Sequence, residues 1–206
     1  MIFLFLDTSS DNLVVSLLRD NEIINEKRIT SLNDHSSYLA VTIREVLNES
    51  NIKLTDINKI LVAVGPGSFT GTRIGITTAK TIAWALNIKV VPVSSLKEYI
   101  FSYSGYDYYI PLEEDKKGSY VCVYDKEYNE VTSESYLHNE ELIPFISKYK
   151  NALIISNKNY DGLNVKEKVL DTQKLINYYK DCEEINPHNL KPNYIKKIDA
   201  ESKLWF

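Results

Sequence analysis

Candidate chemistry concentrates in one glycine-rich stretch. Four of the seven glycines lie in GPGSFTGTRIG (65–75), between an apolar run and a helical pattern. A glycine loop that leads from a strand into a helix N-terminus can bind phosphate, because exposed N–H groups and the helix dipole attract an anion. The spacing does not fit the known phosphate loops. Thr70 stands where the P-loop and the dinucleotide-binding pattern both require a glycine, and no Lys follows Gly71.

Asp7 ends the first apolar run and is a second candidate for nucleotide chemistry. Actin-like kinases use an aspartate at this position, usually followed by a loop of glycine and hydroxyl residues, whereas DTSS (7–10) contains no glycine. The alternative is that Asp7 caps or turns the strand. A residual nucleotide site would use Asp7, Gly65, Gly67 and Thr70.

The remaining reactive residues do not form catalytic patterns. His35, His138 and His188 are far apart and make no HxxxH or HExxH pair, so a zinc or iron hydrolase would lack its nitrogen ligands. No serine lies in GxSxG. The run EED (113–115) before KKG (116–118) is typical of a charged hairpin. We therefore expect no catalytic residue, no metal and no cofactor.

Small residues form a strip on the helix that follows the glycine loop. A glycine inside a helix costs roughly 0.5–1 kcal/mol relative to alanine, so a packing reason is needed. A smooth strip lets another backbone approach closely and predicts a tight helix–helix contact. The contact is either internal, against the helix at 35–50 or the sheet, or with a second protein. The strip consists of Gly67, Gly71, Gly75, Ala79 and Ala83.

Apolar residues on the same helix exceed what one buried stripe requires. This excess favours a protein partner. The residues concerned are Ile74, Ile76, Ile82, Trp84 and Leu86.

Hydrophobic periodicity predicts a first lobe in the order βββαβαβ through residue 95. Ser95 and Glu98 then predict a capping box for a further helix. The expected elements are strands within 2–10, 12–20 and 22–30, a helix within 34–50, a strand at 59–67, a helix at 70–86 closed by Asn87, and a strand at 88–95.

The second half repeats a shortened version of this order, which indicates two copies of one α/β unit. We place the boundary near residue 100, which gives lobes 1–100 and 101–206. The expected elements are strands near 108–112, 119–125 and 130–137, a helix at 139–149, a strand at 152–156 and a helix at 169–182, after which Pro187 and Pro192 interrupt any pattern.

The composition excludes several classes of protein. The 206 residues are 44% hydrophobic, with 24 basic and 28 acidic side chains and a net charge of −4. Proteins that hold nucleic acid alone usually show a clustered positive footprint, so direct tight binding of RNA or DNA is disfavoured. The longest apolar runs, Ile2–Leu6 and Ile60–Val64, are far shorter than the ~20 residues that span a bilayer. We expect no membrane contact and a cytoplasmic location.

Four motifs resemble the TsaB (YeaZ) family, whose members are needed for threonylcarbamoyladenosine at position 37 of tRNA. They are FLDTSS (5–10), HSS (35–37), GPGSFTGTRIGITTAKTIAWAL (65–86) and VVPVSSL (90–96). The likeness extends through about residues 1–100. Beyond it, EEDKKGSYV (113–121) stands in place of the family's DARRGEVY, and YIK (194–196) in place of YLR.

The resemblance implies a two-lobed actin-like (ASKHA, ribonuclease H-like) α/β fold and no catalysis of its own. By this resemblance, the chain would act as a scaffold or activator of TsaD, the related enzyme that transfers threonylcarbamoyl to N6 of adenosine 37. TsaD binds its metal through an HxxxH helix, where this chain offers His35 and then Leu39. By the same resemblance, the ATPase TsaE joins the complex, tRNA is reached only through the complex, and the TsaD-binding helices can also form a homodimer.

The resemblance places the partner surface on the two first-lobe helices. The residues assigned to the partner surface are His35, Leu39, Ile43, Leu47, Gly67, Phe69, Gly71, Arg73, Ile74, Gly75, Ala79, Ile82 and Ala83.

Two other classes of function stay open. A small actin-like ATP-dependent kinase is disfavoured by the missing glycine after Asp7. A metallopeptidase-like hydrolase is disfavoured because the histidines form no metal-binding pair.

Overall fold

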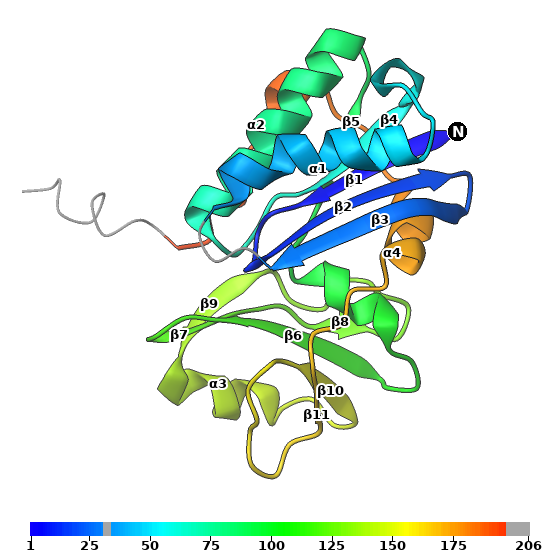
Figure 1. The fold of residues 1–206 in the computed structure, drawn as a ribbon. Helices are drawn as coiled ribbons and strands as arrows, with labels where there is room; N and C mark the ends of the chain where they lie inside the picture. Colours follow the sequence, from blue (N-terminus) through cyan, green and yellow to red (C-terminus); the bar gives the residue numbers. More distant parts are fainter. Residues whose placement is uncertain (31–33, 197–206) are drawn as a thin grey trace, which may run out of the picture. The chain divides into compact units, whose positions relative to one another are not determined.

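The computed structural model describes residues 1–30 and 34–196, which form two compact units (Figure 1). The chain leaves the first unit near residue 100, but it returns for Asp171–Pro192, which the sequence pattern assigns to the second lobe. The last residues of that expected lobe, 197–206, lie outside the described residues. The first unit consists of Met1–Glu98 and Asp171–Pro192, and the second of Tyr99–Leu170 with 193–196.

Asp171–Pro192 is held to the first unit by apolar and backbone contacts. Helix α4 (Thr172–Tyr179) buries Leu175 and Ile176. Ile185 and Val90 exchange backbone hydrogen bonds, with N···O distances of 2.9 and 3.2 Å. The apolar pattern predicts the helix but not its attachment, because periodicity does not say which sheet an apolar face covers.

The first unit is built on a five-stranded sheet in the order β3-β2-β1-β4-β5. Strands β1 to β3 are antiparallel neighbours, and β4 and β5 run parallel to β1. Helices α1 and α2 share one apolar core with this sheet (Figure 1), and the expected order βββαβαβ is confirmed. The bounds are β1 (Ile2–Asp7), β2 (Asn12–Arg19), β3 (Glu22–Thr30), α1 (His35–Glu49), β4 (Lys59–Ala63), α2 (Phe69–Leu86) and β5 (Val90–Val93).

The two ends of α2 are set by local residues. Ser68 Oγ accepts the N–H of Gly71 at 3.1 Å, and Asn87 ends the helix in the left-handed conformation with a φ of 55°. The helix expected after the Ser95 and Glu98 capping box is wrong, since only a 3-10 segment, η2 (Lys97–Ser102), forms there. The Ser95 hydroxyl accepts the N–H of Gly65 (3.1 Å).

The second unit is built on a six-stranded sheet in the order β11-β10-β6-β7-β9, with β8 paired to β6. The strand expected at 119–125 is divided into β7 and β8. Across both units, no helix among the described residues has the length and apolar character needed to cross a membrane. The bounds are β6 (Tyr108–Glu114), β7 (Gly118–Val121), β8 (Tyr124–Asp125), β9 (Ser135–His138), α3 (Asn139–Ile146), β10 (Ala152–Ile155) and β11 (Val165–Lys166), with 3-10 segments η1 (Leu54–Asp56) and η3 (Pro187–Asn189).

Candidate partner-binding site

Asp7 stabilises the turn that follows β1. Its Oδ1 accepts the N–H of Ser9 at 2.7 Å, and the residue is 2% exposed. Burial raises the pKa of the Asp7 carboxyl, although hydrogen bonds from Ser9 and a contact with Glu98 oppose that rise. The interpretation of Asp7 as a turn residue is confirmed.

The glycines of GPGSFTG allow the start of α2 to contact this turn. The Ser68 N–H donates to the Ser9 carbonyl at 2.6 Å, and Thr8 Oγ1 donates to the Gly71 carbonyl at 2.7 Å. A Cβ on Gly71 would overlap the Thr8 carbonyl oxygen, and a Cβ on Gly67 would overlap that of Ser9. The glycine spacing therefore serves a backbone contact within the chain.

The small-residue strip faces the interior of the first unit. Gly71, Gly75, Ala79 and Ala83 are all buried. A Cβ on Gly75 would meet the Thr8 side chain at 2.5 Å and Val62 of β4 at 3.8 Å. The internal alternative therefore describes the strip: Gly75 faces Thr8 and the sheet, and Gly71 faces the turn after β1 and His35 of α1.

The candidate nucleotide residues do not share one open surface. Asp7 and Gly65 are buried, Gly67 is partly buried and Thr70 is exposed. Gly65 exchanges hydrogen bonds with Ser95, from its N–H to Oγ (3.1 Å) and from the Ser95 N–H to its carbonyl (3.0 Å). In the part of the chain that the structure describes, no group of His, Cys, Asp and Glu is arranged to hold a metal ion. Nucleotide binding here stays a prediction without a supporting contact.

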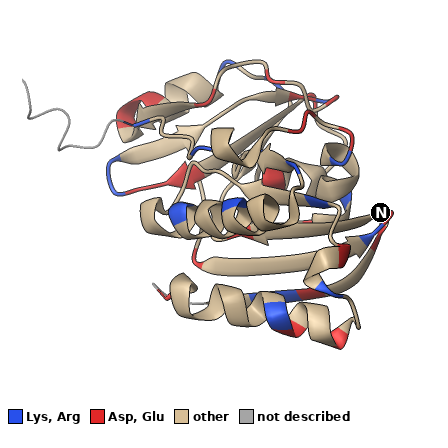
Figure 2. Cartoon of the chain, turned by 90° about the horizontal axis from the view of Figure 1, so that it is seen from above, with Lys and Arg blue, Asp and Glu red and all other residues tan. Residues whose placement is uncertain are grey.

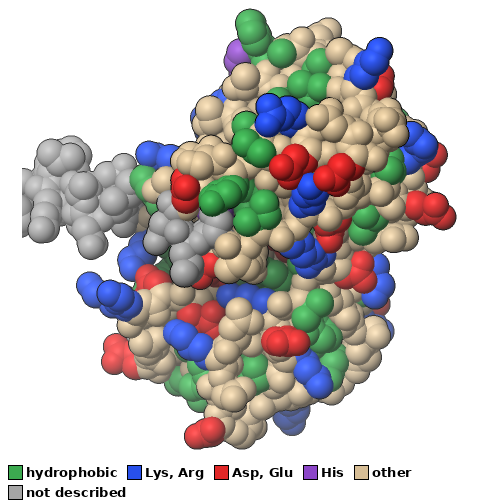
Figure 3. Space-filling model, viewed as in Figure 1, with side chains coloured by type: hydrophobic (Ala, Val, Ile, Leu, Met, Phe, Trp, Pro, Cys, Tyr) green, Lys and Arg blue, Asp and Glu red, His purple; other side chains and the backbone are tan. Residues whose placement is uncertain are grey.

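A groove of about 650 Å³ lies between α1 and α2. Its apolar lining comes from both helices and from the segment that follows α1. Figure 3 shows hydrophobic side chains among charged ones on the face of the first unit seen there. The groove is lined by Ala40, Ile43, Arg44, Leu47, Asn48, Ile52, Lys53, Leu54, Thr77, Thr78, Thr81 and Ile82.

The structure separates the residues assigned to the partner surface. Ile43, Leu47 and Ile82 line the groove. Phe69 and Arg73 are exposed at the first turns of α2, with the guanidinium carbon 3.8 Å from the centre of the Phe69 ring. The others are buried or partly buried in their own unit: His35, Leu39, Gly67, Gly71, Ile74, Gly75, Ala79 and Ala83.

Two exposed apolar residues of α1 lie outside both the groove lining and the residues assigned to a partner. Tyr38 and Val41 of α1 are 45% and 39% exposed, and neither was assigned to a partner. Their spacing of three residues, outside the buried stripe of α1, is the available signal for a second apolar face. The threonines of the groove, Thr77, Thr78 and Thr81, carry no such signal.

The charges on α1 divide between the groove and the sheet. Lys27 of β3 pairs with Glu49 (2.5 Å) and Glu45 (2.9 Å), and these hydrogen bonds raise the pKa of Lys27. The charged residues that line the groove are Arg44 and Lys53. Charges of both signs are otherwise dispersed over the chain (Figure 2). The groove is thus apolar with a basic border.

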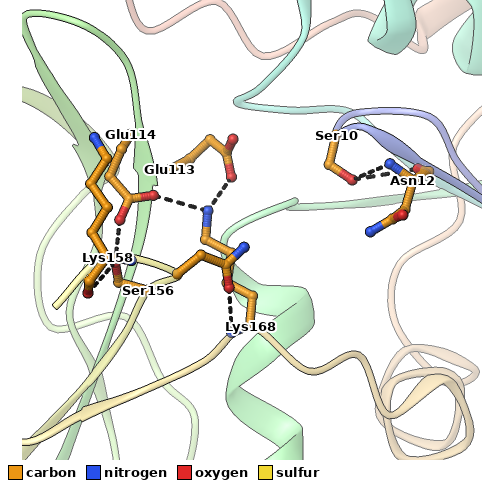
Figure 4. A network of polar contacts seen from close by, with 8 residues as sticks. Ser10, Asn12, Glu113, Glu114, Ser156, Lys158 and Lys168 are labelled. Carbon is orange, nitrogen blue, oxygen red and sulfur yellow. Dashed lines mark hydrogen bonds and ion pairs between the residues drawn. The ribbon is translucent and has the colours of Figure 1, made fainter. Parts of the chain in front are cut away.

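The acidic run of the second unit is bound within that unit. Lys168 Nζ lies 2.7 Å from Glu113 and 3.2 Å from Glu114, and Ser156 donates to Glu114 (Figure 4). Asp115 accepts the N–H groups at the β6–β7 turn. Burial raises the pKa of Asp115, but hydrogen bonds, first that of the Tyr136 hydroxyl, outweigh it and lower the pKa to about 2. The charged hairpin is confirmed.

Fold and topology define an actin-like (ASKHA, ribonuclease H-like) α/β protein. A solved structure of YeaZ from Pseudomonas aeruginosa has this fold: the TM-score is 0.79 over 94% of this chain and 99% of that chain, at 21% identity.

Sequence comparison identifies the family. The family model of TsaD, tRNA N6-adenosine threonylcarbamoyltransferase, matches residues 22–143. The tRNA threonylcarbamoyladenosine biosynthesis protein TsaB of Bacillus subtilis is 29% identical over 98% of this chain and 97% of its own length. A tRNA N6-adenosine threonylcarbamoyltransferase of Geotalea uraniireducens is 27% identical over 50% of this chain and 34% of its own length. The chain belongs to the TsaD-type family and, within it, to the TsaB (YeaZ) branch.

Proposed function

We propose that this chain is a non-catalytic subunit of the machinery that forms threonylcarbamoyladenosine at position 37 of tRNA, and that it binds TsaD through the α1–α2 groove. The observation that carries the proposal is the groove itself, an open apolar surface on the helices that carry the family motif. The Bacillus subtilis relative, which matches over nearly its whole length and is named for biosynthesis of this nucleoside, supports the choice of process.

Two side chains in the first turns of α1 support a role without catalysis. His35, at the start of α1, has its Nε2 2.8 Å from the Ser10 carbonyl oxygen, so the ring fastens the helix to the turn after β1. Leu39, where a second histidine would complete an HxxxH pair, is buried in the apolar core. A metal-dependent transfer would have to take place on the partner.

The groove suits a partner helix. An amphipathic helix can place its apolar residues between Ile43, Leu47 and Ile82, as in other helix-in-groove complexes. Acidic residues at the border of such a helix would face Arg44 and Lys53. A second copy of this chain is a competing occupant of the same surface, and TsaE and tRNA would join through the assembled complex.

Binding would act on TsaD by population shift. A subunit without catalytic groups can raise the activity of its partner only if it binds the active conformation more tightly than the inactive one. The groove is the surface on which that differential affinity would arise.

An omission assay tests the process. TsaD, TsaE, threonylcarbamoyl-adenylate, ATP and unmodified tRNA are combined with and without this chain, and modified A37 is measured. We expect modification only when the chain is present, and no ATP hydrolysis or transfer by the chain alone. Equal modification in both reactions would overturn the assignment to this process.

Thr81→Arg tests the surface. Thr81 is exposed and lines the groove, so a long cation there should block a partner helix and weaken TsaD binding at least about tenfold, or about 1.4 kcal/mol. Ile143→Arg, at an exposed position of α3, is the control and should bind TsaD as the wild type does. Wild-type TsaD binding by Thr81→Arg would exclude the groove.

A further inference from the structure

The cations at the border of the groove have no counter-charge within it. Arg44 and Lys53 line the groove, and no acidic residue of the described chain does. Both are exposed, and within residues 1–30 and 34–196 neither side chain forms an ion pair. The border of the groove therefore carries an uncompensated positive charge.

The carboxylates nearest in the chain make other contacts. Glu45 and Glu49 of α1 turn toward β3, where Lys27 pairs with them at 2.9 and 2.5 Å. Asp56 accepts the backbone N–H of Lys53 at 2.9 Å. Helix α2 contains no Asp or Glu. Neither helix therefore directs a carboxylate into the groove.

The apolar lining of the groove does not select its occupant. Ile43, Leu47 and Ile82 can pack against any partner of suitable shape, and specific interfaces usually also contain an element that disfavours the wrong partner. A second copy of this chain bound groove to groove would be related by a two-fold axis, which places the same surface on both sides of the contact. The cations of one copy would then meet a surface whose only lining charges are also cations, and such a contact costs free energy.

We propose that Arg44 and Lys53 select the occupant of the groove, a step that rests on the assignment of this groove to TsaD under the proposed function. The two cations favour a partner helix that carries acidic residues beside its apolar stripe, and they disfavour self-association. Charge thereby decides between the two occupants that apolar packing alone leaves in competition.

Salt should change the two contacts in opposite directions. The Debye length is about 10 Å at 0.1 M and about 3 Å at 1 M, so salt screens both the attraction of an acidic helix and the repulsion between two copies. Raising sodium chloride from about 0.05 to about 0.5 M should weaken TsaD binding by the wild type and strengthen its self-association. Titration calorimetry with TsaD and sedimentation velocity of the chain alone measure the two effects without any substitution.

Arg44→Glu should reverse the selection. Arg44 is exposed, so the fold should tolerate the change. A carboxylate at this position can face Lys53 of a second copy and would repel an acidic helix, so we expect self-association to tighten and TsaD binding to weaken, each at least about tenfold. Arg19→Glu, at the exposed end of β2, makes the same change in net charge outside the groove lining and should behave as the wild type.

Equal self-association of the wild type and Arg44→Glu would overturn the proposal, as would wild-type self-association that falls or stays constant as salt rises. Thr81→Arg separates this failure from that of the proposed function. Weak TsaD binding by Thr81→Arg with wild-type binding by Arg44→Glu would keep TsaD in the groove and overturn only the selection by charge. Wild-type binding by both variants would exclude the groove as the TsaD site, and the selection with it.

Discussion

The two long faces of α2 differ in composition and in what they contact. One face carries Gly71, Gly75, Ala79 and Ala83 and is buried in the first unit. The opposite face carries Thr77, Thr81 and Trp84, all exposed, with Trp84 at 69%. The same helix therefore has a face fitted to its own chain and a face available to another protein.

The difference between the faces separates two uses of small residues. At Gly71 the missing Cβ makes room for the Thr8 carbonyl, so a backbone contact inside the chain fixes the residue type. At Thr81 the side chain borders an open groove, and its size decides what the groove can admit. Substitutions on one face should change stability, and substitutions on the other should change binding.

Gly71→Ala tests the internal face and should have the largest effect. The new Cβ would overlap a backbone oxygen, which cannot move as a flexible side chain would, so we expect a loss of about 2–3 kcal/mol in the free energy of unfolding. Urea denaturation measures it. The neighbouring exposed Thr70→Ala should stay within about 0.5 kcal/mol of the wild type.

Equal stabilities for these two variants would show that the glycine spacing is not set by the Thr8 contact. The assignment of the buried face would then fail, and the alternative of a partner contact at the strip would reopen.

Trp84→Ala tests the outer face. Trp84 is exposed and lies three residues after the groove residue Thr81, and a large exposed aromatic is the residue type that most often anchors an interface. We therefore expect TsaD affinity to fall by about 2 kcal/mol, while the free energy of unfolding changes by less than about 0.5 kcal/mol. Titration calorimetry and urea denaturation on the same samples separate the two effects. Val131→Ala, exposed in the second unit, serves as the control for binding.

Unchanged TsaD affinity in Trp84→Ala would confine the partner to the groove proper. A loss of stability as large as the loss of affinity would instead show that Trp84 belongs to the internal packing, and the contrast between the faces would disappear.

The sequence predicts the first unit well because its elements carry their own boundary signals. Alternation and apolar runs give β1 to β3, and Ser68 and Asn87 delimit α2. The second unit has weaker signals. One apolar run, 119–125, is divided between two partners of β6, and β11 is only two residues long, too short for any period to appear.

The site is only partly predictable for a related reason. The GPGSFTG spacing shows that something must approach α2 closely, but not that the Thr8 and Ser9 carbonyls do so. Glu98 is read from sequence as a capping residue, whereas the structure buries it completely, because burial after β5 depends on how the strands of the sheet are paired. The groove requires two helices to be placed side by side, which no single-helix pattern contains.

Ser68→Ala should have the smallest effect. It tests the N-cap of α2, the end of the helix that both faces share. The Ser68 hydroxyl accepts the Gly71 N–H at 3.1 Å, whereas its backbone N–H holds the Ser9 carbonyl and is kept in the variant. Loss of the cap alone should lower the free energy of unfolding by about 1 kcal/mol. Ser36→Ala, at an exposed position in the first turn of α1, is the matched control and should change little. A loss much larger than about 1 kcal/mol would mean that the hydroxyl supports the turn after β1 as well as the helix.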